Sequence, residues 1–499
     1  MNMNELLNYI FGYGTLSLYF IVPMIAAVVG IYFLFFRLDL LFLGLVVVLV
    51  FFNSQTSGAI GAESNTIYYR GSGMLYLPIV TWVVLGGFLA AVTLGPFRQQ
   101  RPDHHLSIEK FYWAFFIMFV AHFAVGLALE IPLEKLLSNN GLFPLFLSCM
   151  VFLWGARLTP KPEQVRQFFN LLIFGLFCRA LFGLGRYAVA GGDSVNIYEN
   201  IEKLGVKVVF FDFHDSTLTT IMVLFSLARL LIDPPRRFYS RAFYVVAIVC
   251  GLLVIGLSHH RASILGLMLG GLVLIAYAPR AARLPLTVGL GAVSFAGVAA
   301  ITVYRLSKIR QGNTGIFSFV YDLAGKSPFE RESSRMLELQ QAFLTILDYP
   351  LFGVGSWGRY RGSGVGWQDL AGESGYETVH NGFLQMGFKS GAVGLTILAC
   401  LFIVYARTCI RFLRESAGWY RCAYIAIFGT AAAMFPNFTI GMVMAQQRGL
   451  FIVALLLLLP FVIRAAEARD KARQPALVPA TEKRRKPLLG TEPFGQPAL

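Results

Sequence analysis

Charged side chains are scarce in this chain of 499 residues. Asp, Glu, Lys and Arg make up 14% of the sequence, hydrophobic residues make up 56%, and the mean hydropathy is +0.64. A typical soluble protein is about 25% charged, so the composition excludes a water-soluble protein of this length. We expect an all-α polytopic integral membrane protein, because lipid offers the backbone no partner outside its own helices.

Several functional signatures are also absent. The sequence has no Walker loop, no dinucleotide fingerprint, no C-x-x-C pair and no internal repeat. Its six cysteines lie in predicted spans or at their inner ends, so we expect no disulfide framework. No basic segment opens the chain, since Glu5 is the sole charge in residues 1–14, and the first span should itself direct insertion. No metal or other cofactor is expected.

Long apolar segments are what the sequence has in place of charge. Thirteen are of about bilayer length, and one of them, 38–53, is short. We therefore expect about 12–13 transmembrane helices. The segments lie near residues 15–36, 38–53, 74–95, 110–130, 141–156, 167–187, 216–232, 242–258, 262–278, 284–304, 380–405, 421–437 and 447–464.

The basic residues predict the orientation of these spans. Alternate loops hold 24 of the 42 Lys and Arg residues, so these loops should be cytoplasmic. The N-terminus and the long loop then lie on the outer side of the membrane. This topology accounts for the net charge of +15, so no nucleic-acid partner is expected.

Four parts are expected along the chain. Residues 1–304 should hold about ten spans, 305–379 a large periplasmic loop with catalytic elements, and 380–464 about three spans. Residues 465–499 are rich in Pro and basic charge, and they should form a disordered cytoplasmic tail near anionic headgroups.

A polar island at residues 333–395 interrupts the apolar pattern. Apolar residues at helical spacing predict an amphipathic helix over 334–348. Pro350 should end that helix, and Gly353 and Gly355 should form a tight turn. His380 follows at the start of the next apolar segment.

The island carries a family resemblance. Arg335, the run from Pro350 to Gly355, and His380-Asn381, followed by Leu384-Gln385, Gly391 and Gly394, resemble the O-antigen ligase and Wzy polymerase superfamily. The run Leu257 to Ala262 (LSHHRA) looks like that family's Ser-Arg signature at a helix start, with His260 where a second Ser or Gly is usual. The resemblance implies a bacterial membrane protein that transfers glycans linked to undecaprenyl diphosphate on the periplasmic face.

Four arginines are candidate ligands for the lipid diphosphate, because guanidinium groups match phosphate oxygens bidentately and keep their charge. Arg261 interrupts an apolar stretch at the membrane surface, and Arg335 opens the amphipathic helix. Arg179 and Arg186 share a helix face. The alternatives are snorkelling to headgroups for Arg261, a solvated helix start for Arg335 and a structural salt bridge for Arg179.

His380 is the candidate for acid–base work on an acceptor hydroxyl, and Arg261 and Arg335 complete the predicted catalytic set. The alternative is a His that hydrogen-bonds at a helix start capped by Asn381. Asp212-Phe213-His214-Asp215 is a possible metal cluster, but no Asp-x-Asp accompanies it. The full set predicted to bind substrate is Arg186, Arg179, His214, Asp215, His260, Gly353, Gly355 and Asn381.

We therefore expect a metal-independent, inverting glycosyltransferase of surface polysaccharide synthesis. Its partners would be the undecaprenyl-diphosphate-linked glycan, an acceptor glycan or lipid A-core, membrane lipids, a chain-length regulator and a flippase. Long loops slightly favour a polymerase, and a ligase to lipid A-core or protein is the alternative. A polysaccharide or glycolipid transporter is a further alternative, against which stand the lack of inverted repeats and the clustering of polar groups at one face.

Overall fold

The computed structural model describes residues 37–52, 68, 77–98, 107–158, 160–193, 207–309, 330–360 and 377–473. Side chains are described for all of these except 94–98, 261, 293–294, 297–298, 300–309 and 330–335. Every regular element in this part of the chain is a helix, which confirms the all-α expectation. The elements are α3 (Leu38–Phe51), α5 (Ile79–Arg98), α6 (Glu109–Ala128), α7 (Leu133–Leu136), α8 (Phe143–Ala156), α9 (Pro162–Ala190), α11 (Phe213–Ile232), α12 (Phe238–Leu257), α13 (Arg261–Tyr277), α14 (Arg280–Ile309), α16 (Glu330–Asp348), α18 (Gly382–Glu415), α19 (Gly418–Ile440), the 3-10 turn η3 (Val443–Ala445) and α20 (Gln447–Arg473).

Twelve of the thirteen predicted apolar segments correspond to one of these helices. The first segment, 15–36, lies outside the described residues. Seven described helices are long and apolar enough to cross a bilayer, namely α6, α9, α11, α12, α18, α19 and α20. The chain is therefore a multi-pass membrane protein. Shorter apolar helices, among them α3 and α8, complete the bundle.

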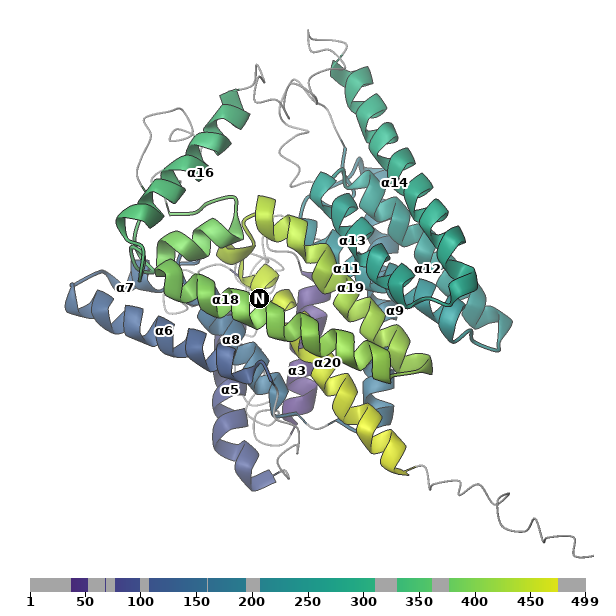
Figure 1. Cartoon of the computed structure of the whole chain (residues 1–499), viewed down its shortest axis with the longest axis horizontal. Helices are drawn as coiled ribbons and strands as arrows, with labels where there is room; N and C mark the ends of the chain where they lie inside the picture. Colours follow the sequence, from purple (N-terminus) through teal and green to yellow (C-terminus); the bar gives the residue numbers. More distant parts are fainter. Residues whose placement is uncertain are drawn as a thin grey trace, which may run out of the picture.

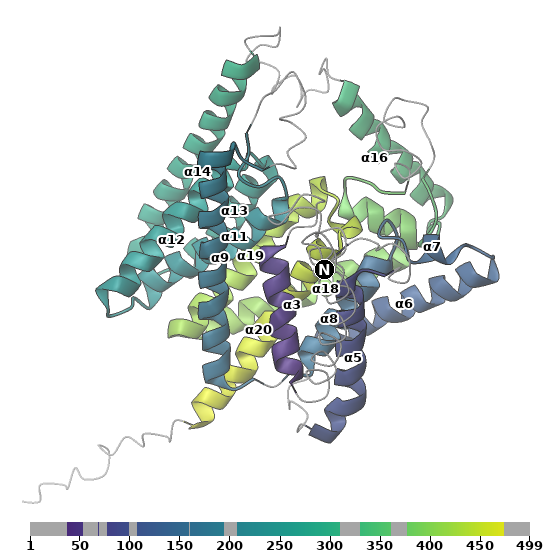
Figure 2. The same ribbon diagram turned by 180° about the vertical axis from the view of Figure 1, so that it is seen from behind.

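The centre of the bundle is formed by α11, α19 and α20, which are mostly buried inside the protein. α19 packs against α11, α13, α18 and α20, and α20 also packs on α8 and α9 (Figure 1). Figure 2 shows α3, α8 and α9 on the opposite face of the molecule. α20 is apolar on all sides over most of its length, which suits such an interior position.

On one side of the bundle, the end of α3 lies beside the starts of α11 and α20. The starts of α11 and α20 bond to the end of α3 through Arg448. The turn between α12 and α13 joins them, since His260 bonds Phe210 just before α11. At the other side, the Arg166–Asp470 ion pair links the start of α9 to the end of α20. The observed helices thus alternate in direction as the sequence predicted.

Glycines allow α13 and α19 to pack with their backbones in close contact. A Cβ atom at Gly266 would lie 2.2 Å from the Ala433 carbonyl oxygen, and one at Gly270 would lie 2.8 Å from that of Gly429. Small residues at such crossings let membrane helices gain dispersion contacts where lipid provides no hydrophobic driving force.

The predicted loop contains the expected helix. α16 ends at Asp348, just before Pro350, and α18 then begins at Gly382. α18 bends at Gly391, whose φ of 62° lies in the left-handed region. α20 continues to Arg473, beyond the predicted span end at 464, because Glu467 and Asp470 are paired with basic side chains there.

Gly266→Ala should lower the free energy of unfolding by about 1–3 kcal/mol, because the added methyl overlaps the α19 backbone. Gly289→Ala on α14 is the matched control, since a Cβ there meets no atom within 4 Å. Ala is the better helix former, so the control should be neutral or slightly stabilised. Thermal unfolding of both purified variants in detergent measures the difference, and equal melting temperatures would contradict the tight α13–α19 contact.

Candidate functional site

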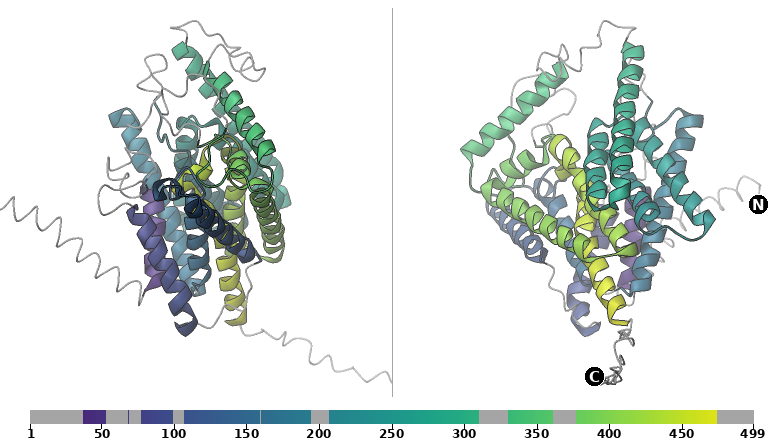
Figure 3. Two further views of the ribbon diagram at one scale, coloured as in Figure 1. Left: turned by 90° about the vertical axis from the view of Figure 1, so that its left-hand side faces the viewer. Right: turned by 45° about the vertical axis from the view of Figure 1, so that its right-hand side comes forward.

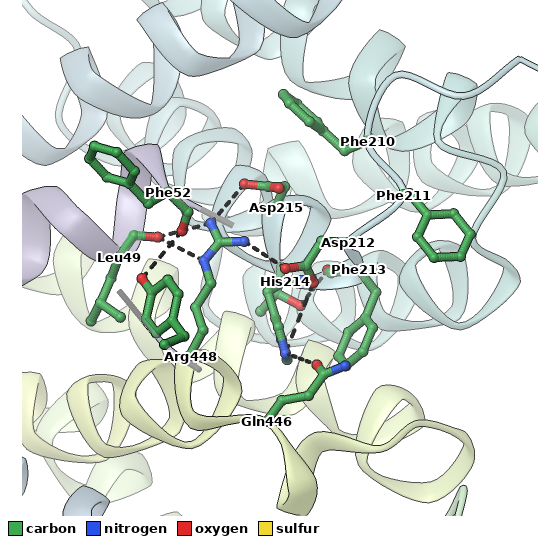
Figure 4. Close-up of polar contacts among 12 residues, drawn as sticks. Leu49, Phe52, Phe210, Phe211, Asp212, Phe213, His214, Asp215, Gln446 and Arg448 are labelled. Carbon is green, nitrogen blue, oxygen red and sulfur yellow. Dashed lines mark hydrogen bonds and ion pairs between the residues drawn. The ribbon is translucent and has the colours of Figure 1, made fainter. Parts of the chain in front are cut away.

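A buried ion network joins α9, α11 and α20 at one side of the bundle, and Figure 4 shows the part around Arg448. Arg448 donates to Asp212 (Nη1–Oδ2, 2.9 Å) and to Asp215 (Nη2–Oδ1, 2.8 Å). Arg179 donates to Asp215 from Nε and Nη2, at 3.3 and 3.2 Å. Arg448 is fully buried, and the other three are at most 3% exposed. Two positive and two negative charges are therefore balanced within the protein.

Backbone groups complete the hydrogen bonding of Arg448. Its Nε and Nη2 donate to the Leu49 carbonyl of α3, at 3.0 and 2.8 Å. Tyr68 lies beside it and donates to the Phe52 carbonyl at 3.2 Å. Burial raises the pKa of the Tyr68 phenol, so it stays protonated and acts as a donor. Arg448 thus ties the end of α3 to the start of α11.

Asp212 has a second role as the N-cap of α11, because its Oδ1 accepts the His214 backbone N–H at 3.0 Å. This cap fixes where His214 and Asp215 point. The His214 ring is fully buried, and its Nε2 lies 2.5 Å from the Gln446 amide oxygen. His214 and Asp215, both predicted to bind substrate, are therefore held in the protein interior.

Arg186 lies on the same helix as Arg179, two turns further along. It pairs with Asp193 at 2.9 Å and donates to the Val209 carbonyl at 2.9 Å. Its guanidinium carbon lies 5.7 Å from the centre of the Phe210 ring, and that of Arg179 lies 4.6 Å from the same ring. Both cations therefore contact one aromatic face, an arrangement that favours positive charge.

His260 connects this network to the turn before α13. Its Nε2 lies 3.2 Å from the Phe210 carbonyl oxygen. His260 is also the N-cap residue of α13, and Arg261 is the first residue of that helix. The structure thus places Arg179, Arg186 and His260 in contact with Phe210, and Arg179 links Phe210 to Asp215.

A second group of predicted residues lies where α16 meets α18. The Glu338 carboxylate accepts from the His380 backbone N–H at 2.6 Å, and both its oxygens lie 3.1 Å from His380 Nδ1. A carboxylate can only accept, so Nδ1 carries the proton and Nε2 is the basic nitrogen of the neutral ring. The side chains of Glu338 and His380 are 14% and 27% exposed, which leaves the ring within reach of a ligand.

Asn381 serves as the N-cap of α18. Its Oδ1 accepts the backbone N–H groups of Phe383 and Leu384, each at 3.0 Å. The cap places His380 directly before the first turn of the helix. A helix start also offers a partial positive charge to any anion bound there.

The glycine turn packs on the bend of α18. Gly353 and Gly355 have φ angles of 68° and 88°, which only glycine adopts readily. A Cβ at Gly353 would lie 2.5 Å from the Phe388 carbonyl oxygen. Lys389, almost fully buried, donates from Nζ to the Ser356 and Gly358 carbonyls at 3.0 and 2.7 Å. Gly353 therefore serves the close approach of two backbones, whereas a Cβ at Gly355 would meet the Trp357 ring at 3.0 Å.

A polar chain bridges the two groups. Gln447, next to Arg448, donates to Asn139 Oδ1 at 3.0 Å. Gln385 in the first turn of α18 donates to the Asn140 carbonyl at 2.9 Å and accepts the Val379 backbone N–H at 2.8 Å. The link between α7 and α8 thus connects the ion network to the segment that carries His380.

For two of the predicted arginines, the structure describes the backbone alone. Arg261 and Arg335 lie on described helices, but their side chains are outside the described part of the structure. Arg335 precedes Glu338 by three residues, so both positions lie on one face of α16.

Sequence reasoning missed Glu338, Lys389 and Arg448. Lys389 and Arg448 are charged residues in apolar helices, and charges in such segments are costly unless paired. Arg448 had a usable signal, as it is the first charge after Arg421 and stands at the start of the last span. Glu338 had none, because a carboxylate on an amphipathic helix resembles any solvated side chain.

A cavity of about 550 Å³ lies at the other side of the bundle, away from both groups, with Arg166, Trp419 and Asp470 in its wall. Neither group contributes to it. Within the described residues, no three His, Cys, Asp or Glu side chains gather as metal ligands would.

Arg448→Leu should lower stability by about 3–5 kcal/mol, because it leaves two buried carboxylates without their shared cation. Arg473→Leu is the control, since the Arg473–Glu163 pair is more than half exposed on both sides and should contribute under about 1 kcal/mol. Thermal unfolding of the purified variants measures both effects. An Arg448 variant as stable as the control would refute the structural role of the network.

Comparison with known proteins identifies the domain that holds the second group. Residues 246–399 match the family model described as O-antigen ligase. The match begins within α12 and ends within α18, so it covers Arg261, α16, the glycine turn and His380. No curated protein matches the chain. Residues 246–399 are therefore similar to the O-antigen ligase family, and this similarity supports a role for the multi-pass protein in the transfer of surface glycans.

Proposed function

We propose that this protein transfers a glycan from undecaprenyl diphosphate to an acceptor sugar, with Glu338 and His380 at the reacting centre. The observation that carries the proposal is the carboxylate–imidazole pair at the start of α18. The pair lies inside the matched family domain. A base oriented in this way is the group that a sugar hydroxyl needs in order to become a nucleophile.

His380 acts as the general base. The acceptor oxygen attacks the anomeric carbon of the donor while its proton passes to His380 Nε2. The bond from that carbon to the diphosphate oxygen breaks, and undecaprenyl diphosphate leaves with the electron pair. Glu338 stabilises the imidazolium that forms and holds the ring in one tautomer. One displacement from the face opposite the leaving group inverts the anomeric centre.

Arg261 and Arg335 neutralise the charge that grows on the diphosphate. Arg261 is the first residue of α13, a position that favours an anion, and Arg335 shares a helix face with Glu338, which places its backbone near the His380 contact. Fixed positive charge at a leaving group lowers the barrier most where water is scarce. Arginine can supply this charge without a metal, which makes the proposed reaction metal-independent.

The paired arginines have a different role in this proposal. Arg179 and Arg448 are neutralised by Asp212 and Asp215, so a diphosphate would have to displace a buried carboxylate to bind them. We assign them to holding the segment before α11, on which His260 and the start of α13 rest. Arg186 is 13% exposed and paired with Asp193, and it borders the donor site.

The reaction belongs on the periplasmic face of the bacterial inner membrane. The basic loops of the sequence support this orientation, because the Lys- and Arg-rich helix ends lie opposite to His380. Lipid-linked donors would then enter from the bilayer, and the product would leave on the outer side.

Two acceptors suit this chemistry. Addition to the next lipid-linked repeat unit would make the protein a polymerase, which the long loop between α14 and α18 favours as a place for an extended glycan. Transfer to lipid A-core would make it a ligase, which the description of the matched family favours. We put the polymerase first and treat the ligase as the second candidate.

Purified protein in nanodiscs, supplied with only its lipid-linked repeat unit, should form a ladder of longer lipid-linked glycans. A reaction that starts only when lipid A-core is added would establish the ligase instead. His380→Ala and Arg261→Ala should each abolish transfer while membrane levels stay normal. Arg280→Ala, an exposed arginine at the other side, is the control and should keep full activity. No transfer by the unmodified protein to either acceptor would refute the proposed function.

Glu338→Gln should lower kcat by about 10²–10⁴-fold with little change in KM, because the amide keeps the contact but removes the charge that stabilises the imidazolium. Glu415→Gln, at the far end of α18, removes a matched carboxylate away from the site and should leave kcat unchanged. Steady-state kinetics on both variants separates the roles. If Glu338 were only structural, its replacement would lower the melting temperature and leave kcat unchanged.

A further inference from the structure

α16 exposes its apolar side to the outside of the molecule. Met336, Phe343 and Leu347 are 69%, 51% and 59% exposed, and their spacing of seven and four places them on one helix face. The opposite face packs on α18, where Ala342 is buried in a cluster with Val379 and Phe388. In a soluble domain the face with the large apolar side chains would be buried. In α16 that face is exposed instead.

The turn after α16 extends the same surface. Tyr349, Leu351 and Phe352 are 56%, 62% and 66% exposed. The six residues Met336, Phe343, Leu347, Tyr349, Leu351 and Phe352 are called the outer strip below. A contiguous exposed apolar surface of this kind marks a site of contact with a partner or a membrane.

The outer strip borders the lipid-facing side of the bundle. Trp357, in the same turn, lies against the end of α6, where a Cβ at Gly126 would come within 2.8 Å of its ring. The Ser356 hydroxyl accepts the Leu142 backbone N–H at 2.9 Å, just before α8. α6 has the composition of a membrane span, and Val125 and Leu127 near its end are exposed. Figure 3 shows α16 at the outer edge of the molecule, beside α18.

We propose that the outer strip lies in the interfacial region of the bilayer, so that α16 is a membrane-surface helix and its partner is lipid. Continuity with the exposed end of α6 favours lipid, since that surface already faces acyl chains. An apolar face with a polar opposite side is what an interfacial helix requires, and Tyr349 is a residue type that prefers this depth.

This placement has a consequence for the site. Glu338 is on the inner side of α16 and holds His380 by three contacts of 3.1 Å or less. A helix anchored in the interface would therefore hold His380 at the height of the headgroups, where the diphosphate of a lipid-linked donor lies. This consequence depends on the proposed function, whereas the contact of the strip with lipid does not.

Nitroxide labels test the contact directly. Single cysteines at Phe343, Leu347 and Phe352 are introduced into a variant whose six native cysteines are replaced, and the labelled proteins are placed in nanodiscs of phosphatidylethanolamine and phosphatidylglycerol. Collision with oxygen, which concentrates in lipid, is compared with collision with a water-soluble nickel chelate. Native Cys400, exposed within the apolar span of α18, is the lipid control when it alone is kept. Lys207→Cys, exposed before α11, is the water control.

Oxygen should dominate at all three strip positions, as at Cys400, and nickel should dominate at Lys207. Nickel access at the three positions would show that the strip faces water. Protection from both reagents would show that protein covers it, either a second copy or another segment of the chain. Both results would overturn the proposal, and neither depends on whether the protein transfers glycans.

Discussion

Arg448 and the two carboxylates it binds are the interaction on which the rest of this bundle depends. A guanidinium without exposure to water is stable in a membrane protein only if its charge and its donors are matched. Asp212, Asp215 and the Leu49 carbonyl provide that match from α11 and α3. Because the three elements are distant in sequence, pairing them fixes how the first and last described helices meet.

Neighbouring residues connect this ion network to the turn before α13 and to the segment that carries His380. Asp215 also holds Arg179, and Arg179 shares the Phe210 ring with Arg186. Phe210 in turn accepts a bond from His260 at the start of α13. On the other flank, Gln447 and the Asn139-Asn140 link connect the network to α18. The buried charges therefore order the scaffold, and the Glu338–His380 pair remains partly exposed, as the proposed reaction requires.

The pairing of Arg179 and Arg448 with buried carboxylates shows that an arginine inside a membrane protein need not bind a ligand. Such an arginine suggests a ligand site when the sequence is considered alone. If it forms an ion pair with a carboxylate on a neighbouring helix, its role is structural. Arg179 illustrates the point, since its spacing with Arg186 indicates a shared face and nothing in that spacing reveals Asp215 as its partner. His380 shows the converse, because its position at a helix start does not reveal that Glu338 contacts its Nδ1 and orients the ring.

The sequence by itself determined the membrane class, the helical spans, their alternating direction and the helix that ends before Pro350. These follow from hydropathy, charge and local backbone preferences, which act over at most a few turns. It also placed His380 at the start of a span. The tertiary structure decided which charges pair, that Gly353 serves a backbone contact, and which side of α16 meets α18. Glu338 and His380 are 42 residues apart, and Arg448 and Asp212 are 236 apart. Contacts over such separations depend on packing of the whole bundle, and no local pattern encodes them.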